Sequence, residues 1–170
     1  MTSLENLEDV VGESHKTLFI LCGYPYAGKS YIANQLASKV EIERISIDDI
    51  FTARGFDWST NNLPNAAEWK EIFEESYAKT KIALMEGKNV LYDSTNQTIE
   101  SRDKLREVAK STGANTYVIY IETPIERVWK RWEENQENPS RPQVSKELVQ
   151  MTIDMLEKPL SSENVIVIEN

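Results

Sequence analysis

The sequence predicts a three-layer αβα fold, in which helices cover both faces of a five-stranded parallel sheet. Five apolar, strand-like runs alternate with segments of helical periodicity along the 170 residues. Right-handed crossovers between such strands give a parallel sheet that is buried on both faces. The length is that of one domain with a proper core. We therefore expect residues 1–16 to form a loose or helical N-terminal lead-in and residues 17–170 to form a single domain.

The first two strands are predicted in the N-terminal third of the chain. Residues 17–22 (TLFILC) form an apolar run, and residues 31–40 (YIANQLASKV) follow it as a helix. Apolar and polar residues alternate over 41–47 (EIERISI), which predicts the second strand. Residues 52–66 contain Gly, Asn and Pro without periodicity, which indicates a loop.

The middle of the chain predicts two helices and two strands. Apolar residues at spacings of three and four indicate a helix over 67–86. A short buried strand is expected at 89–92 and a further helix from Thr98 to about 111, where Gly113 stops it. The apolar run at 116–121 (TYVIYI) predicts the fourth strand.

The C-terminal part predicts a lid around residues 124–145. Pro124 opens a helix at its first turn, a favoured position for proline. Residues 133–143 are polar and contain two prolines, which predicts a mobile loop. Ser145 is expected to cap the last helix, and residues 165–168 (VIVI) to form the fifth strand.

Residues 23–30 (GYPYAGKS) fit the phosphate-binding pattern G-x-x-x-x-G-K-[ST], known as the P-loop. The backbone N–H groups of such a loop form a nest for an anion, and the following helix N-terminus adds positive potential. The lysine side chain reaches the β- and γ-phosphates, and the serine hydroxyl binds Mg²⁺. The sequence therefore predicts a nucleoside triphosphate and Mg²⁺ as cofactors, and the motif alone does not separate ATP from GTP. The expected nucleotide contacts from this region are Gly23, Tyr24, Pro25, Tyr26, Ala27, Gly28, Lys29, Ser30 and Tyr31.

Three carboxylates follow predicted strands, at the edge of the sheet where ligands bind. Asp93 fits the position of a second Mg²⁺ ligand opposite Ser30, although an aspartate there can also form a turn. Asp48 and Asp49 follow the second strand. One of them could cap the next segment, or could accept the proton of a substrate hydroxyl as it attacks the γ-phosphate. We favour Asp48 as this base, and the sequence alone does not separate it from Asp49.

Arginines flank the predicted lid loop. Arg127, Arg131 and Arg141 could stabilise the charge that spreads over a transferring phosphoryl group, with Arg127 also touching the nucleotide. The alternative is a solvated helix face, since Arg127 and Arg131 have the i, i+4 spacing. Arg102 and Arg106 lie on a predicted helix and are expected to be surface groups.

The acceptor is expected beside residues 52–66. Arg54, Trp58 and Asn61 lie in this segment, and Trp58 could stack on a ring or cover the core. With Asp48 and with Asn96, which follows the third strand, Arg54 completes the expected substrate contacts.

The composition limits the partners and the compartment. A formal net charge of −9 disfavours broad nucleic-acid binding, which rests on Lys and Arg contacts to phosphates, but does not exclude a local basic groove. No apolar run approaches the length of a membrane span, and the acidic N-terminus is unlike a secretory signal. We therefore expect a cytoplasmic protein without membrane partners. The single cysteine, Cys22, excludes an internal disulfide and is expected to be a buried, inert thiol.

Four segments in this order and spacing carry a family resemblance: GYPYAGKS, ISIDDIF, VLYDSTNQTIESRDKL and ETPIERVWKRWEENQ. Through these four segments, the chain resembles the AAA-type P-loop kinases related to phage polynucleotide kinase, chloramphenicol phosphotransferase and zeta-toxin-like kinases. The resemblance implies a P-loop NTPase fold and ATP as the nucleotide, with Asp48 as general base and Arg127 and Arg131 as lid arginines. In the polynucleotide kinases an arginine that contacts nucleic acid stands three residues after the base, and here that position is Phe51.

The expected function is therefore ATP-dependent transfer of the γ-phosphate to a hydroxyl of a small molecule. One alternative is a polynucleotide 5′-hydroxyl kinase, which the net charge and Phe51 disfavour. The other is a nucleotide-dependent binding module, which would have no need of an acceptor base such as Asp48.

Overall fold

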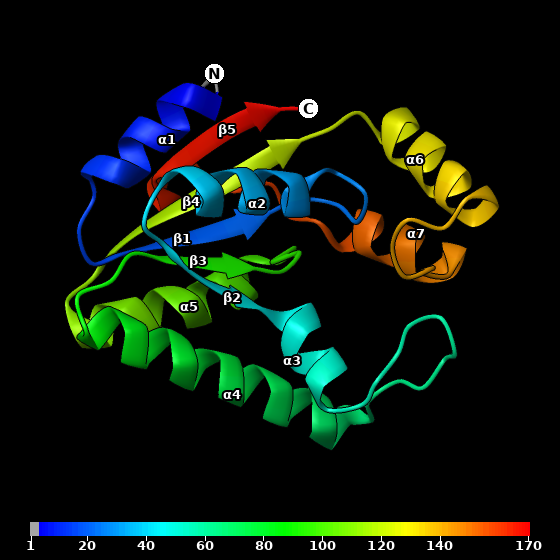
Figure 1. The fold of residues 1–170 in the computed structure, drawn as a ribbon, viewed down its shortest axis with the longest axis horizontal. Helices are drawn as coiled ribbons and strands as arrows, with labels where there is room; N and C mark the ends of the chain where they lie inside the picture. The colour runs from blue at the N-terminus through cyan, green and yellow to red at the C-terminus, as the bar shows by residue number, and fades with distance from the viewer. Residues whose placement is uncertain (1–3) are drawn as a thin grey trace.

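The computed structural model describes residues 4–170 and consists of a parallel sheet between two layers of helices (Figure 1). All neighbouring strands are parallel, in the order β2-β3-β1-β4-β5. The predicted fold class is confirmed. The strands are β1 (Thr17–Cys22), β2 (Glu43–Ser46), β3 (Val90–Asp93), β4 (Asn115–Glu122) and β5 (Val165–Glu169). The helices are α1 (Leu4–Glu13), α2 (Lys29–Lys39), α3 (Ile47–Ala53), α4 (Ala66–Met85), α5 (Ile99–Thr112), α6 (Ile125–Glu137), α7 (Lys146–Met155) and the 3₁₀ turn η1 (Ser161–Glu163).

The central strand β1 is buried along its whole length, because helices cover it from both sides. Its side chains alternate between two apolar clusters. Leu18 and Ile20 pack with α3, α4 and α5, whereas Phe19 and Leu21 pack with α1 and α2. Helix α1, within the predicted lead-in, contributes to the second cluster through side chains that are fully buried, Leu7 and Val11.

Several predicted helix ends are confirmed by their caps. The Thr98 and Ser145 side chains accept backbone N–H bonds at the starts of α5 and α7. Gly113 ends α5 in the left-handed conformation at φ 71°. Asn65 and Glu68 form a capping box at the start of α4, one residue before the expected start.

Three predicted segments are wrong in part. The strand predicted over 41–47 is shorter, since β2 ends at Ser46, and the predicted loop 52–66 begins as the last residues of α3. Asp48 and Asp49 lie in the first turn of α3, which Ser46 caps because its Oγ accepts the Asp49 N–H. The predicted loop 133–143 begins as helix, since α6 continues to Glu137. The chain then folds back, and the Asn135 side chain accepts N–H bonds from Ser140 and Arg141.

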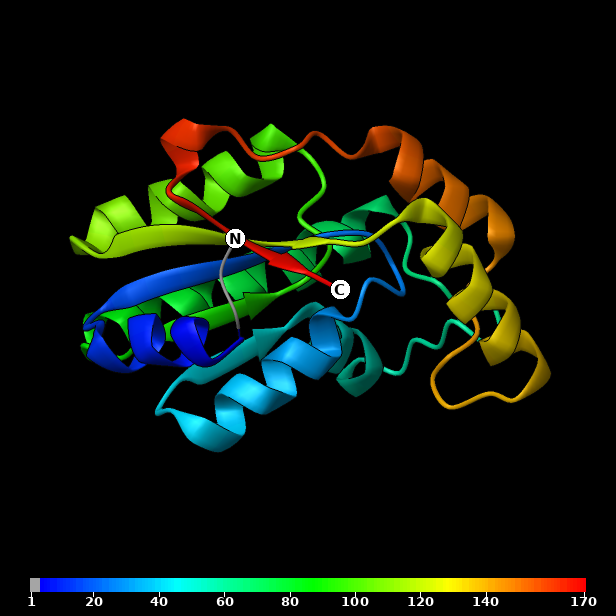
Figure 2. The same cartoon turned by 90° about the horizontal axis from the view of Figure 1, so that it is seen from above.

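Helices α6 and α7 stand beyond the carboxyl ends of the strands (Figures 1 and 2). A third, small apolar cluster of Tyr26, Val128 and Val149 joins them to the P-loop. This pair of helices with the connection between them, residues 125–155, is called the lid below. Within residues 4–170, no helix combines the length and the apolar character that crossing a membrane requires.

Candidate functional site

The loop at residues 23–28 connects β1 to α2 and has the backbone shape of an anion nest. Gly23, Tyr26 and Gly28 have positive φ angles of 154°, 62° and 99°. The loop is held by neighbouring elements, since the Gly23 N–H donates to the Thr95 carbonyl at 3.2 Å and the Thr123 hydroxyl donates to the Ala27 carbonyl at 3.1 Å. Gly28 has a φ of 99°, which residues other than glycine rarely adopt, so this position favours glycine.

The Lys29 ammonium lies inside this loop. Its Nζ donates to the Gly23 carbonyl at 3.0 Å and the Tyr24 carbonyl at 2.6 Å. Burial lowers the pKa of Lys29 to about 8, against the opposing effect of negative charge from Asp93 and Asp48. The lysine therefore sits where the phosphate pattern requires it, and its charge is sensitive to pH in the alkaline range.

Nucleotide binding is expected to take up a proton at about pH 9. At this pH the Lys29 side chain of the nucleotide-free protein is mostly neutral, whereas the negative charge of a bound triphosphate favours its protonated form. The affinity for the nucleotide therefore falls by up to about tenfold for each pH unit above 8. Isothermal titration calorimetry with ATP, in buffers of different ionisation enthalpy, measures the uptake. In Lys29→Met the uptake should vanish; equal uptake in both proteins contradicts this role of Lys29.

Three arginines of the lid gather near the P-loop. Arg131 donates from Nη1 to the Tyr26 carbonyl at 3.1 Å and from Nη2 to the Asn170 side chain at 3.3 Å. The Arg141 guanidinium stacks over the Tyr26 ring, 4.7 Å from its centroid. Burial lowers the pKa of Arg131, and the positive charges of Arg127 and Arg141 lower it further. Such crowding of like charges is relieved when an anion binds among them.

The Asp48 carboxylate lies beside Lys29 and Trp58. It is open to solvent, yet the surrounding protein raises its pKa by desolvation, as do the charges of Asp93 and Asp49. The Trp58 Nε1–H donates to Asp48 Oδ1 at 3.5 Å, and this bond and the Lys29 charge lower the pKa. The carboxylate therefore combines access from solvent with the raised pKa of a candidate base.

The predicted metal ligands, Ser30 and Asp93, lie after β1 and at the end of β3, which are neighbouring strands. Ser30 is exposed at the start of α2, and Asp93 is buried at the end of β3. Asp93 Oδ2 accepts two bonds from Arg44, at 3.0 Å from Nε and 2.5 Å from Nη2. Among residues 4–170, no group of three or more His, Cys, Asp or Glu side chains could hold a metal ion. Mg²⁺ binding by Ser30 and Asp93 therefore stays a prediction that depends on phosphate oxygens as further ligands.

Of the other residues predicted to contact the acceptor or the nucleotide, Arg54 and Asn96 are bonded to protein groups. Arg54 is paired with Glu71 at 2.8 Å and with Glu75 at 2.9 Å, so its charge is already neutralised. Asn96 is buried and donates to the Leu21 carbonyl at 2.6 Å, which ties the turn after β3 to β1. Asn61 is exposed in a turn, with φ 57°. Tyr31 and Arg127 are exposed.

Arg102 was expected at the surface, and this expectation is wrong. Its side chain is fully buried and forms a double hydrogen bond with Glu163, at 2.7 Å from Nε and 3.1 Å from Nη2. Its Nη1 also donates to the Asn96 carbonyl at 2.9 Å. Cys22, expected to be buried and inert, is fully buried, and burial raises the pKa of its thiol to about 11. No local pattern predicts the Arg102 pair, because Glu163 is 61 residues away in the sequence.

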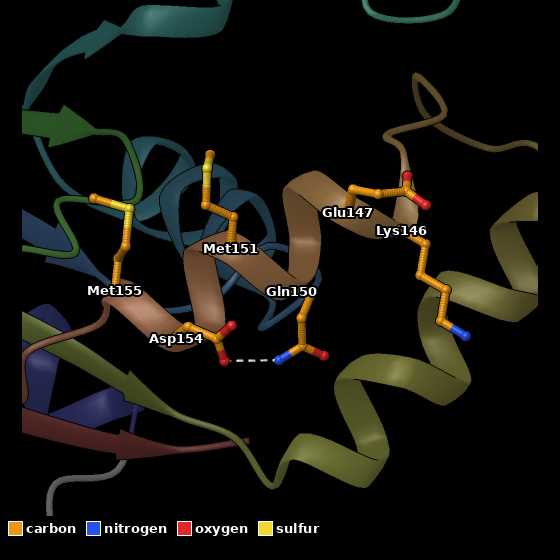
Figure 3. Close-up of a pocket in the computed structure, with 6 residues that line it drawn as sticks. All are labelled: Lys146, Glu147, Gln150, Met151, Asp154 and Met155. Atoms are coloured by element: carbon orange, nitrogen blue, oxygen red, sulfur yellow. Dashed lines mark hydrogen bonds between the residues drawn. The ribbon is translucent and has the colours of Figure 1, made fainter.

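Two surface hollows lie on the outer side of the lid and at the start of α5. The first is lined by α7, whose Met151 and Met155 project to one side, while Gln150 and Asp154 are joined by a hydrogen bond on another (Figure 3). The second shares Asp154 and Met155 and adds three further carboxylates, Glu100, Asp103 and Glu157. None of the predicted phosphate-binding or catalytic residues lines either hollow.

Comparisons with known proteins concern the family and the fold of the chain. A sequence profile described as an AAA domain matches residues 18–159. The L-seryl-tRNA(Sec) kinase of Methanococcus maripaludis is 31% identical over 119 residues, which cover 67% of this chain and 44% of that protein. The chain thus spans less than half the length of this relative.

Solved structures share the fold. A chain of the Pnkp1/Rnl/Hen1 RNA repair complex superposes with a TM-score of 0.70 at 21% identity, over 82% of this chain and 43% of that chain. A gluconokinase from Sinorhizobium meliloti 1021 superposes with a TM-score of 0.65 at 16% identity, over 91% of this chain and 82% of that chain. At these identities the similarity concerns the fold alone.

Proposed function

We propose that this chain transfers the γ-phosphate of ATP to a hydroxyl group of a small molecule. The premise is that the chain belongs to the AAA domain family and has a kinase-like P-loop fold. The observation that carries the proposal is the convergence of Lys29, Arg131 and Asp48. Lys29 and Asp48 lie close enough for each charge to shift the pKa of the other. Arg131 reaches the same loop from the lid. A lysine within the loop, an arginine of the lid and an exposed carboxylate are thus all associated with the P-loop.

The residues fit ATP and Mg²⁺ through the backbone of the P-loop and its lysine. In the proposed reaction, Lys29 and the loop N–H groups hold the phosphates, and Arg127 and Arg131 stabilise the charge of the transferring group. Asp48 orients the acceptor hydroxyl and takes its proton. Ser30 and Asp93 would hold Mg²⁺, which supplies charge neutralisation at the β- and γ-phosphates.

The charges around Asp48 favour a small acceptor over a nucleic acid. Asp49 lies next to Asp48, and Asp57 lies in the adjacent loop. The arginine of this region, Arg54, is bound by two glutamates on α4. The surface hollows near the lid add further carboxylates, and Lys146 there faces the Trp129 ring at 5.8 Å. A polyanion would meet repulsion on these surfaces.

The names of the relatives leave room for a macromolecular acceptor. One relative is named for a seryl-tRNA and one structure for RNA repair, whereas another is a gluconokinase. The polynucleotide 5′-hydroxyl kinase is therefore the second candidate. It differs from the first in requiring salt-sensitive binding of the acceptor.

Incubation with ATP labelled in its γ-phosphate separates these functions. The acceptor panel contains pooled sugars, nucleosides and amino alcohols on one side and 5′-hydroxyl oligonucleotides on the other. Label is expected in a small molecule and absent with Lys29→Ala, which controls for contaminating kinases. Label on oligonucleotides alone, or release of phosphate to water alone in every pool, contradicts the proposal.

A further inference from the structure

The indole of Trp58 is placed against the proposed base by a structured turn. Asp57 and Asn62 form two backbone hydrogen bonds, at 3.0 and 3.1 Å, which close the turn that carries Trp58. The Asn62 side chain also donates to the Gly55 carbonyl at 2.8 Å. These bonds fix the backbone on both sides of Trp58.

An aromatic stack fixes the ring itself. Trp58 stacks on Phe51 with a centroid distance of 4.7 Å and an interplanar angle of 12°. Phe51 is buried in the core and belongs to α3, the helix that also carries Asp48. Trp69 of α4 supports the pair, 5.7 Å from Phe51 and 5.9 Å from Trp58. The base and its indole neighbour are thus anchored to one helix.

The Trp58 N–H differs from the other groups around the Asp48 carboxylate. Lys29 from α2 attracts the carboxylate, and Asp93 from β3 and Asp49 from α3 repel it. Trp58, from the α3–α4 connection, is an uncharged donor with one N–H and no acceptor. A donor of this kind occupies one carboxylate oxygen and cannot take up a proton itself.

We propose that Trp58 is a positioning residue, whose indole N–H holds Asp48 Oδ1 and thereby directs Oδ2 toward the acceptor hydroxyl. This inference rests on the proposed function in its assignment of Asp48 as the base. The bond of 3.5 Å is long, as hydrogen bonds at catalytic groups often are before substrate binds. It also favours the ionised carboxylate, the form that can accept a proton.

The first test needs no acceptor. In the ¹⁵N-labelled protein, the Trp58 indole N–H signal is expected to shift as Asp48 titrates, with an apparent pKa above the ordinary value for Asp because desolvation raises it. In Asp48→Asn this titration should disappear. The Trp132 signal is an internal reference, because its N–H donates to the Val144 backbone carbonyl at 2.8 Å. A Trp58 signal that stays constant, or that titrates equally in Asp48→Asn, overturns the proposal.

The second test uses Trp58→Phe, which retains the ring on Phe51 and removes the N–H. The pKa of Asp48, measured by carboxyl ¹³C shifts, should rise in this variant. Because of this rise, the acidic limb of the pH–rate profile for phosphate release from Mg·ATP should move to higher pH. The rate at neutral pH should fall by about tenfold, since a hydrogen bond to a charged group is lost. Trp69→Phe, the matched control from the same stack, should leave both properties unchanged.

The outcomes separate this inference from the proposed function. An unchanged Asp48 pKa in Trp58→Phe, or an equal change in Trp69→Phe, overturns the role of Trp58, even if Asp48→Asn abolishes transfer. Wild-type transfer in Asp48→Asn overturns the role of Asp48 as base, whatever the indole signal shows. If Trp58→Phe does not fold, the Trp58 indole N–H signals of wild type and Asp48→Asn still decide whether Trp58 is bonded to Asp48.

Discussion

Asp48→Asn is expected to lower phosphoryl transfer by about 10²- to 10⁴-fold, the range over which a positioned general base accelerates a reaction. The amide retains the size of the carboxylate and its hydrogen bond acceptor for Trp58, but it cannot take the proton of the acceptor hydroxyl. The affinity for ATP should stay within about threefold of wild type, because the P-loop contacts are unchanged. Rates with the acceptor found in the panel, and nucleotide titrations, measure the two quantities separately.

Asp49→Asn is the matched control for this prediction. Asp49 lies in the same turn of α3, is exposed, and uses its backbone N–H to bond Ser46. It should therefore retain nearly the full rate. If Asp49→Asn is inactive and Asp48→Asn is active, the base is the neighbouring carboxylate. The acidic limb of the wild-type profile should lie above the ordinary pKa of Asp, and activity should fall as the pH drops through this raised value.

Arg102→Ala is expected to destabilise the protein by about 3 kcal/mol, the lower end of the cost of breaking a buried ion pair, because Glu163 loses its double hydrogen bond but keeps Arg106 as a charged partner. Glu163 is 3% exposed and also accepts bonds from the Leu160 N–H and from Arg106. Without Arg102, its carboxylate keeps only these two donors in a buried position. The free energy of unfolding, measured by urea denaturation, tests the prediction.

Arg106→Ala is the control, because this side chain bonds the same glutamate from a more exposed position, with 23% of its surface accessible. Its cost should be about 1 kcal/mol. Replacing both partners, as in Arg102→Met with Glu163→Leu, should recover much of the loss, since an apolar pair can substitute for a buried ion pair. If Arg102→Ala and Arg106→Ala lower the free energy of unfolding equally, burial of the Arg102–Glu163 pair does not determine its contribution to stability.

The same pair predicts how stability depends on pH. Burial alone would raise the pKa of Glu163, but the bonds from Arg102, Leu160 and Arg106 lower it to about 2. A carboxyl with a lowered pKa stabilises the fold above its unfolded value, near 4.5, and this contribution is lost as the pH falls toward 2. In Arg102→Ala the acid-induced loss should be smaller.

The sequence was sufficient for the fold and the phosphate loop because their signals are local. Four of the strands are short apolar runs and the second alternates apolar with polar residues, and the caps at Thr98, Gly113 and Ser145 are residue types that favour helix ends. The start of α3 was missed although its signal is local too. Ser46 fits the polar position of an alternating strand equally well, and only the bond from the Asp49 N–H to its Oγ identifies it as a helix cap.

The charged partners could not be predicted, because they come from distant parts of the chain. Arg44 and Asp93 are 49 residues apart, and Arg102 and Glu163 are 61 residues apart. Which arginine stays free for a ligand depends on these pairings. Arg54 is the clearest example, since its position in the sequence suggested substrate binding and the structure binds it to Glu71 and Glu75.

Tyr26 joins the P-loop to the lid. Its backbone belongs to the P-loop, whereas its ring is buried among Val128 and Val149 beneath Arg141. Moving the lid helices away from the P-loop would remove the apolar neighbours of the Tyr26 ring, a loss that hydration of its buried, unpaired hydroxyl would partly offset. If the lid moves away from the P-loop, the Tyr26 ring has two possible positions. It moves with the lid, which bends the loop backbone between Gly23 and Gly28, or it stays in place and is exposed to water. Nucleotide exchange and release of the phosphorylated product should accordingly share one barrier.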